Sequence, residues 1–154
     1  MANDPSKPFT RADLIAALND DLSREYQAII AYVVYSQSIK GAQYMNIKEE
    51  LEKHAKEELA HALTVARHID YLGGTVTATP KPVQTSDKAV DMLRFDLDNE
   101  NDTVKNYRQR VRQCEALEEY GIAEDIREIL REEQEHQSDL ADALGEDVPD
   151  VSKL

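Results

Sequence analysis

Apolar residues recur at spacings of three and four along four long stretches of the chain, a pattern typical of helices that bury one face. In the first stretch, for example, Leu18, Leu22 and Ile29 fall on one side of a helix. Each stretch is long enough for several helical turns and is bounded by polar or helix-breaking residues. We predict helices at Thr10–Lys40, Tyr44–Leu72, Ser86–Leu117 and Gly121–Leu144.

Glycine and capping residues support these boundaries. Gly41 and Gly145 follow the first and fourth stretches, where a left-handed residue can end a helix. Thr10 and Ser86 precede the first and third stretches and are predicted N-caps. Asp13, three positions after Thr10, completes a pattern that resembles a capping box.

The connector lengths predict the topology. The first two helices are joined by a short turn, as are the last two, so each pair is expected to be antiparallel. The connector 73–85 reaches about 43 Å when extended, and the helix before it is also about 43 Å long. It can therefore cross the whole molecule. We predict an all-α four-helix bundle with one long crossover between the second and third helices, comprising an extension at 1–9, the bundle at 10–144 and a tail at 145–154.

Carboxylates and imidazoles interrupt the apolar faces near the middles of the helices. One constant sequence offset maps Glu25 onto Glu100 and Glu58 onto Glu133, and it also relates the apolar positions of the two helix pairs. This repeat offset predicts two equivalent half-sites around a pseudo-twofold axis. The candidate catalytic and metal-ligating residues are Glu25, Glu58, His61, Glu100, Glu133 and His136.

Four buried glutamates need compensating positive charge, because each desolvated ion costs several kcal/mol and a domain is stable by only about 5–15 kcal/mol. No lysine or arginine occupies these positions, whereas two divalent metal ions would balance the charge. A glutamate and a histidine at i and i+3 share a helix face and offer one oxygen and one nitrogen ligand. This mixture suits iron or manganese better than the thiolate-rich sets that favour zinc, and the spacing does not choose between iron and manganese.

These residues resemble the ferritin superfamily, bacterioferritin most closely, over residues 10–144. The resemblance is densest in Met92–Leu97 and Glu128–His136. It implies a ferroxidase that oxidises Fe(II) with O2 or H2O2 and stores ferric mineral in a hollow homo-oligomeric shell. It also implies that Glu25 and His61 hold one iron, Glu100 and His136 hold the other, and Glu58 and Glu133 bridge the two.

Other polar residues near the candidate site receive less specific roles. Tyr32 and His54 are candidates for positions next to the ligands, and His54 is also considered as a ligand of a transient third iron or as an ordinary core histidine. We interpret Tyr107, His68 and Cys114 as core residues.

The resemblance also carries expectations about haem and assembly. Bacterioferritins bind haem through a methionine that follows the first glutamate of the Glu-x-x-His motif in the second helix, where this chain has Leu59. We therefore expect no haem.

The larger shells of the family have 24 subunits and usually a short fifth helix, whereas the tail after Gly145 is short and contains Pro149. We expect no fifth helix and favour 12 subunits over 24.

Composition narrows the functional classes. The net charge of −13 disfavours nucleic-acid partners, and the longest apolar run, 28–35, is too short to span a membrane. A single cysteine favours a reducing, cytoplasmic location.

Two alternative functions stay open. One is a soluble di-metal redox enzyme without storage, such as a manganese catalase or a peroxidase. The other is a metal-free scaffold or Dps-like shell. Dps-like shells generally place their metal site between subunits, whereas the six candidate ligands here lie within one chain.

Overall fold

The computed structural model describes residues 7–154, which form a bundle of four long helices without strands in that range. Two single-turn 3-10 helices, Ala42–Tyr44 and Val151–Lys153, accompany the bundle. This confirms the predicted all-α four-helix bundle, although several helix ends are displaced by less than one turn. The helices are α1 (Arg11–Ser38), α2 (Met45–Tyr71), α3 (Ala89–Ala116) and α4 (Tyr120–Leu144).

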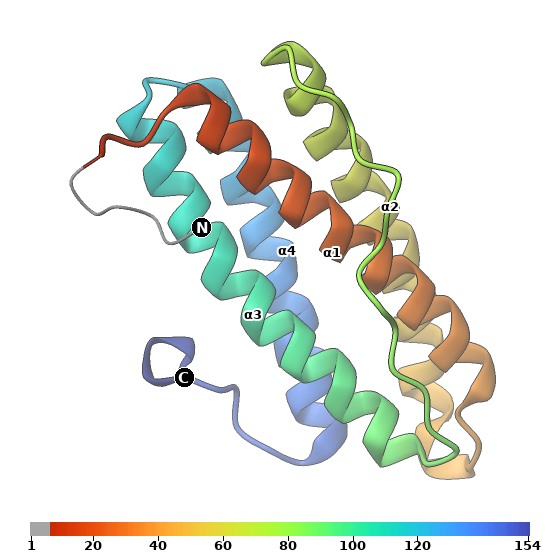
Figure 1. Ribbon diagram of the computed structural model, residues 1–154. Helices are drawn as coiled ribbons and strands as arrows, with labels where there is room; N and C mark the ends of the chain where they lie inside the picture. Colours follow the sequence, from red (N-terminus) through yellow and green to blue (C-terminus); the bar gives the residue numbers. More distant parts are fainter. Residues whose placement is uncertain (1–6) are drawn as a thin grey trace.

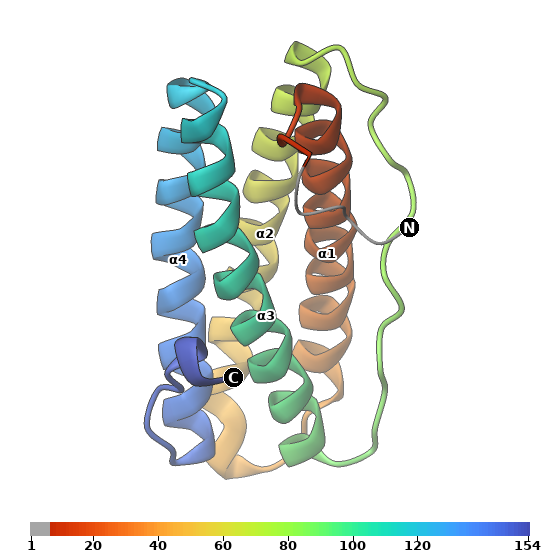
Figure 2. The same ribbon diagram turned by 60° about the vertical axis from the view of Figure 1, so that its left-hand side comes forward.

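The helices are arranged as two antiparallel pairs, α1 with α2 and α3 with α4 (Figure 1). The connection 72–88 runs along the length of the bundle beside α1, so that α3 begins at the opposite end from the end of α2 (Figure 2). Helices α2 and α3 are therefore parallel, and the structure contains the predicted long crossover.

Hydrogen bonds hold the crossover on the surface of α1. The backbone N–H of Lys81 donates to the carbonyl of Ser23 over 3.0 Å. The hydroxyl of Tyr26 donates to the carbonyl of Thr77 over 3.1 Å. The extended segment thus obtains from α1 some of the backbone partners that it cannot find within itself.

Of the two predicted N-caps, one is confirmed and one is wrong. Thr10 caps α1 in a capping box with Asp13. Helix α3 starts later than predicted, with Lys88 at the N-cap position. The Ser86 hydroxyl accepts from the Lys88 N–H over 3.1 Å and donates to Asp91 over 2.8 Å, so Ser86 stabilises the turn before the helix.

The turn between α3 and α4 sets the depth of the candidate residues in the second helix pair. It occupies positions 117–119, with Glu118 in the left-handed region at φ 59°. Counted along the chain from Glu118, the depths of Glu100 and Glu133 differ by less than one helical turn. Glu25 and Glu58 lie almost equally far from the other turn, at Ala42. The four glutamates can therefore reach the same level of the bundle.

The core consists of two apolar clusters with a polar layer between them. One cluster includes Leu18 and Val65, and the other includes Leu51 and Leu93. The candidate ligands lie between these clusters along their helices. Packing on both sides fixes the backbones that carry the polar layer.

The tail after α4 folds back against the bundle. Val151 is only 3 % exposed, and the Lys105 ammonium donates to the carbonyl of Leu154 over 2.9 Å. Within the described residues the tail forms one 3-10 turn and no further α-helix. No helix in residues 7–154 combines the length and apolarity needed to cross a membrane.

Candidate metal centre

The structure brings the six candidate ligands together in the polar layer. One comes from α1, two from α2, one from α3 and two from α4, and each is only 1–3 % exposed. Their donor atoms form two groups that share two glutamates. The members are Glu25, Glu58, His61 and Glu133 in one group, and Glu58, Glu100, Glu133 and His136 in the other.

The first group surrounds the Nδ1 atom of His61. This atom lies 2.9 Å from Oε2 of Glu58, 3.2 Å from Oε1 of Glu133 and 3.7 Å from Oε2 of Glu25. Three carboxylates from three helices thus converge on one imidazole nitrogen.

The second group repeats this arrangement around Nδ1 of His136. That atom lies 3.0 Å from Oε1 of Glu58, 3.1 Å from Oε2 of Glu133 and 3.6 Å from Oε1 of Glu100. Glu58 and Glu133 therefore present one oxygen to each imidazole, as bridging ligands would. Glu25 and Glu100 each belong to one group, as terminal ligands would.

The unpartnered atoms of this layer fit a pair of metal ions. Oε2 of Glu25, Oε1 of Glu58, both carboxylate oxygens of Glu133 and Nδ1 of His136 are buried and make no hydrogen bond. Buried polar atoms are normally satisfied, and within residues 7–154 the ion pairs of the four glutamates of the layer are with histidines alone. Four carboxylates and two imidazoles would match the charge and ligand preference of two divalent ions.

The charges in the layer are strongly coupled. Burial, followed by the charges of Glu133 and Glu25, raises the pKa of Glu58 well above its ordinary value. Burial and Glu133 raise the pKa of Glu100 to about 7. Burial and the charge of Glu25 act in the same direction on Glu133, but the two histidines close to its oxygens outweigh them and lower its pKa. Bound cations would remove the repulsion that raises the first two pKa values.

Two tyrosines orient the terminal glutamates, and only one of them was a candidate from sequence. The hydroxyl of Tyr32 donates to Oε1 of Glu100, and the hydroxyl of Tyr107 donates to Oε1 of Glu25. Tyr107 lies in the core, as interpreted from sequence, and it also contacts a terminal glutamate as Tyr32 does. The available signal was the repeat offset, which maps Tyr32 onto Tyr107.

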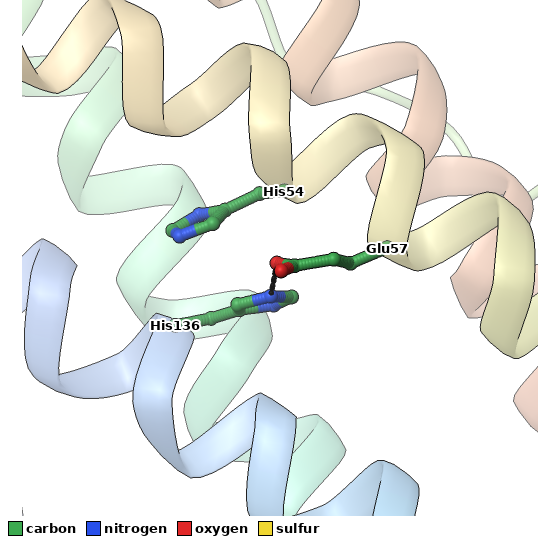
Figure 3. Close-up of side chains that lie close together, drawn as sticks. All are labelled: His54, Glu57 and His136. Carbon is green, nitrogen blue, oxygen red and sulfur yellow. Dashed lines mark hydrogen bonds and ion pairs between the residues drawn. The ribbon is translucent and has the colours of Figure 1, made fainter.

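Two further glutamates hold the outer nitrogens of the histidines, and the sequence reasoning gave them no such role. Nε2 of His61 lies 2.8 Å from Oε2 of Glu132, and Nε2 of His136 lies 2.8 Å from Oε2 of Glu57 (Figure 3). If each Nε2–H donates to its glutamate, the Nδ1 lone pair faces the centre. The sequence did contain a sign of this role. The motif Glu-Glu-x-x-His occurs in both helix pairs, and the repeat offset maps its first glutamate, Glu57, onto Glu132.

The remaining histidines lie beside the centre and do not belong to its two groups. His54 is fully buried and stacks on His136 with ring centroids 4.0 Å apart. Burial and the nearby His136 lower the pKa of His54 to about 4. His68 was expected in the core, but it is only partly buried, and its Nε2 lies 2.8 Å from Oδ2 of Asp125.

Buried aspartates next to the centre are neutralised differently in the two halves. Asp21 accepts from Nε of Arg110 over 2.7 Å and from its Nη2 over 3.1 Å. The repeat offset maps Asp21 onto Asp96, which has no such arginine and whose Oδ2 has no hydrogen-bond partner. Burial and the charge of Glu100 raise the pKa of Asp96 well above its ordinary value. Arg110 thus balances the charge of Asp21, whereas the raised pKa of Asp96 favours its neutral form.

A cavity of about 160 Å³ reaches the centre from the α1 and α3 side. All four glutamates of the centre contribute to its lining, and Lys81 of the crossover and Arg24 of α1 also line it. Its volume is sufficient for several waters or a small oxidant.

A family model described as ferritin-like domain matches residues 15–147. Among curated proteins, the chain is 28 % identical over 127 residues to a bacterioferritin of Desulfovibrio desulfuricans, covering 82 % of this chain and 71 % of that protein.

Two solved structures share the fold over most of the chain. One is described as a ferritin-like, diiron-carboxylate protein from Bacillus anthracis, with a TM-score of 0.84 and 30 % identity over 94 % of this chain and 99 % of that one. The other is a dodecameric thioferritin, the bacterioferritin-related protein from Bacteroides fragilis, with a TM-score of 0.82 and 28 % identity. That alignment covers 89 % of this chain and 87 % of the other.

Proposed function

We propose, since this chain belongs to the ferritin-like domain family and resembles bacterioferritins, that it is a ferroxidase that takes up Fe(II) and stores the ferric product. The observation that carries the proposal is the shared position of Glu58 and Glu133, each with one oxygen near each histidine. Such carboxylates can hold two iron ions close enough to react with one oxidant molecule.

The reaction is a two-electron oxidation shared by two Fe(II) ions. Each Fe(II) loses one electron, and O2 accepts both electrons with two protons to become H2O2. With H2O2 as oxidant, the same two electrons and two protons break the O–O bond and give two waters. Glu25 and Glu100 would hold one ion each at the ends of the pair, with their positions fixed by the hydroxyls of Tyr107 and Tyr32.

Storage requires an enclosed volume, so we propose a hollow homo-oligomer with 12 subunits favoured over 24. A groove between α1 and α2 is lined in part by Ile29, Val33 and Leu59, and Val33 and Leu59 are each 52 % exposed. An exposed apolar strip of this kind is suited to contact with a second subunit. The description of the Bacteroides fragilis relative as dodecameric also supports this number.

We further propose a cytoplasmic location for the protein, because its single cysteine favours a reducing compartment.

An aerobic Fe(II) titration with recovery of the protein tests both parts of the proposal. We expect rapid oxidation of two Fe(II) per chain, followed by accumulation of many more iron atoms in a particle of about 12 chains. Native mass measurement and iron analysis of that particle provide the readout. A 24-mer would refute the size. A monomer or dimer that oxidises two Fe(II) without accumulating iron would refute storage and favour a soluble di-metal oxidase, catalase or peroxidase, including a manganese enzyme.

We further propose that the protein binds no haem, because Leu59 lacks a ligand atom at the position of the bacterioferritin methionine. Protein produced with excess haem is expected to show no stoichiometric Soret band after purification. The Leu59→Met variant, prepared in parallel, tests whether a ligand at this position is sufficient for binding. A Soret band of one haem per two chains in the unsubstituted protein would contradict the proposal.

A further inference from the structure

A second kind of polar cluster lies between α2 and α4, outside the two groups of the metal centre. Glu50 and His54 come from α2, one turn apart, and Asp139 comes from α4. One donor atom of each residue lies within 4.8 Å of the others. Nε2 of His54 is 3.1 Å from Oδ2 of Asp139.

Packing alone does not explain the histidine in this cluster. The repeat offset that relates the two helix pairs places Ile129 at the position equivalent to His54. Ile129 is 5 % exposed and fills its place with apolar atoms. His54 is 0 % exposed, and its Nδ1 atom has no hydrogen-bond partner. Burying an imidazole with an unpartnered nitrogen costs stability. Its other nitrogen, Nε2, faces Asp139, and a metal ligand role for Nε2 offers a reason to keep a histidine here.

The cluster opens to solvent through an acidic cavity. The cavity has a volume of about 470 Å³ and includes Glu49, Glu50, Asp139 and Asp142 in its lining, with no lysine or arginine. The nearest ammonium is that of Lys53, 3.8 Å from Oε2 of Glu50 on the exposed side of the helix. A cation entering the cavity would thus meet several carboxylates, and Lys53 would be its local competitor.

A similar pair on the same two helices serves as an internal comparison. His68 of α2 and Asp125 of α4 lie 2.8 Å apart, and the His68 side chain is 17 % exposed. Within residues 7–154, no third histidine, cysteine or carboxylate joins this pair at metal-ligand spacing. Because it lacks a third possible ligand, we interpret the pair of His68 and Asp125 as an ordinary surface ion pair or hydrogen bond.

We propose that Glu50, His54 and Asp139 form a third site, which binds one divalent first-row transition-metal ion. One imidazole nitrogen and two carboxylates, with the remaining positions open to water, suit Fe(II), Mn(II), Co(II) or Zn(II). The site lies beside the di-metal centre, because His54 stacks on His136 and Glu57 joins both histidines in a further group of donors (Figure 3). The proposal concerns equilibrium binding and does not depend on the oxidation chemistry.

Anaerobic calorimetric titration of the metal-stripped full-length protein with Co(II) tests the third site. We expect three ions per chain in the unsubstituted protein and two in Asp139→Asn and Glu50→Gln. Asp125→Asn is the matched control, because it makes the same change on the same helix in the His68 pair, and it should retain three. Two ions in the unsubstituted protein, or three in both Asp139→Asn and Glu50→Gln, would overturn the proposal.

Two additional variants separate this site from the di-metal centre and from a purely structural role for His54. In the double variant Glu58→Gln/Glu133→Gln, which removes both bridging carboxylates, one ion should still bind and should be lost on adding Asp139→Asn. Lys53→Gln should tighten binding of the third ion about fivefold, since it removes a positive charge about 4 Å from a ligand. Loss of all binding in the double variant would refute a separate site.

Discussion

Fe(II) oxidation is expected to slow at least a hundredfold when either Glu58 or Glu133 is replaced by glutamine. Each of these side chains offers one oxygen to each half of the centre, so either substitution weakens both iron positions together. Loss of an interaction that positions two reactants can account for about 10²-fold or more in rate. The initial rate of ferric absorbance after mixing with two Fe(II) per chain is the measurement.

The control for these variants is Glu135→Gln, which makes the same chemical change on α4. Glu135 is well exposed, and within residues 7–154 its ion pair is with Arg131, 3.0 Å away. The oxidation rate of this variant should therefore stay within twofold of the unsubstituted protein. Circular dichroism of all three variants checks that the bundle has formed. Rates in Glu58→Gln and Glu133→Gln that match the control would refute the bridging assignment and the ferroxidase proposal.

The six candidate ligands could be identified from sequence because two independent patterns coincide on them. Helical periodicity predicts that Glu25 and Glu58 face the core, and the repeat offset predicts the same for Glu100 and Glu133. Charged residues at core positions are costly, which makes their repetition informative. The structure places all six in one layer, although their binding of metal stays a proposal.

Residues that act through the ligands were harder to identify. Glu57 and Glu132 occupy partly exposed positions, where a carboxylate normally only contacts solvent, and nothing in helical periodicity shows that each reaches a histidine on the opposite helix. Tyr107 has the size and polarity of a common core residue, so its contact with Glu25 depends on the packing of α3 against α1. Cross-helix contacts of this kind follow from helix rotation and depth, which sequence spacing does not determine.

The connections between the helices could also be predicted only in part. The length of the crossover was sufficient to predict that it spans the bundle, because reach depends only on residue number. That the crossover lies along α1 depends on particular hydrogen bonds, such as those from Lys81 to Ser23 and from Tyr26 to Thr77. Likewise, the start of α3 was misplaced because Ser86 stabilises either an N-cap or the turn before one.

The contribution of Glu100 to the stability of metal-stripped protein is expected to fall as pH rises from about 4.5 to 7. Over this range the folded state keeps a proton on Glu100, whose pKa burial and Glu133 raise to about 7, while the unfolded chain releases it near 4.5. The unfolded state thus gains relative to the folded state as pH rises through the window. Glu58 contributes in the same direction. His54, whose pKa burial lowers to about 4, contributes in the opposite direction, so the Glu100 contribution is measured as the difference between the unsubstituted protein and Glu100→Gln. A shift from 4.5 to about 7 corresponds to a loss on the order of 3 kcal/mol.

Bound metal should reverse this pH dependence. Metal binding requires deprotonated carboxylates, so the stabilisation grows with pH, and each ion contributes about 2.7 kcal/mol at a free concentration of 100 Kd. Urea unfolding at pH 5, 6 and 7, at one fixed protein concentration, with chelator or with redox-stable Mn(II), measures both slopes. Glu100→Gln should flatten the slope of the stripped protein, and Glu135→Gln should leave it unchanged. Equal slopes with and without Mn(II) would mean that these glutamates and histidines do not bind the metal, because the removal of their protons links metal affinity to pH in this range.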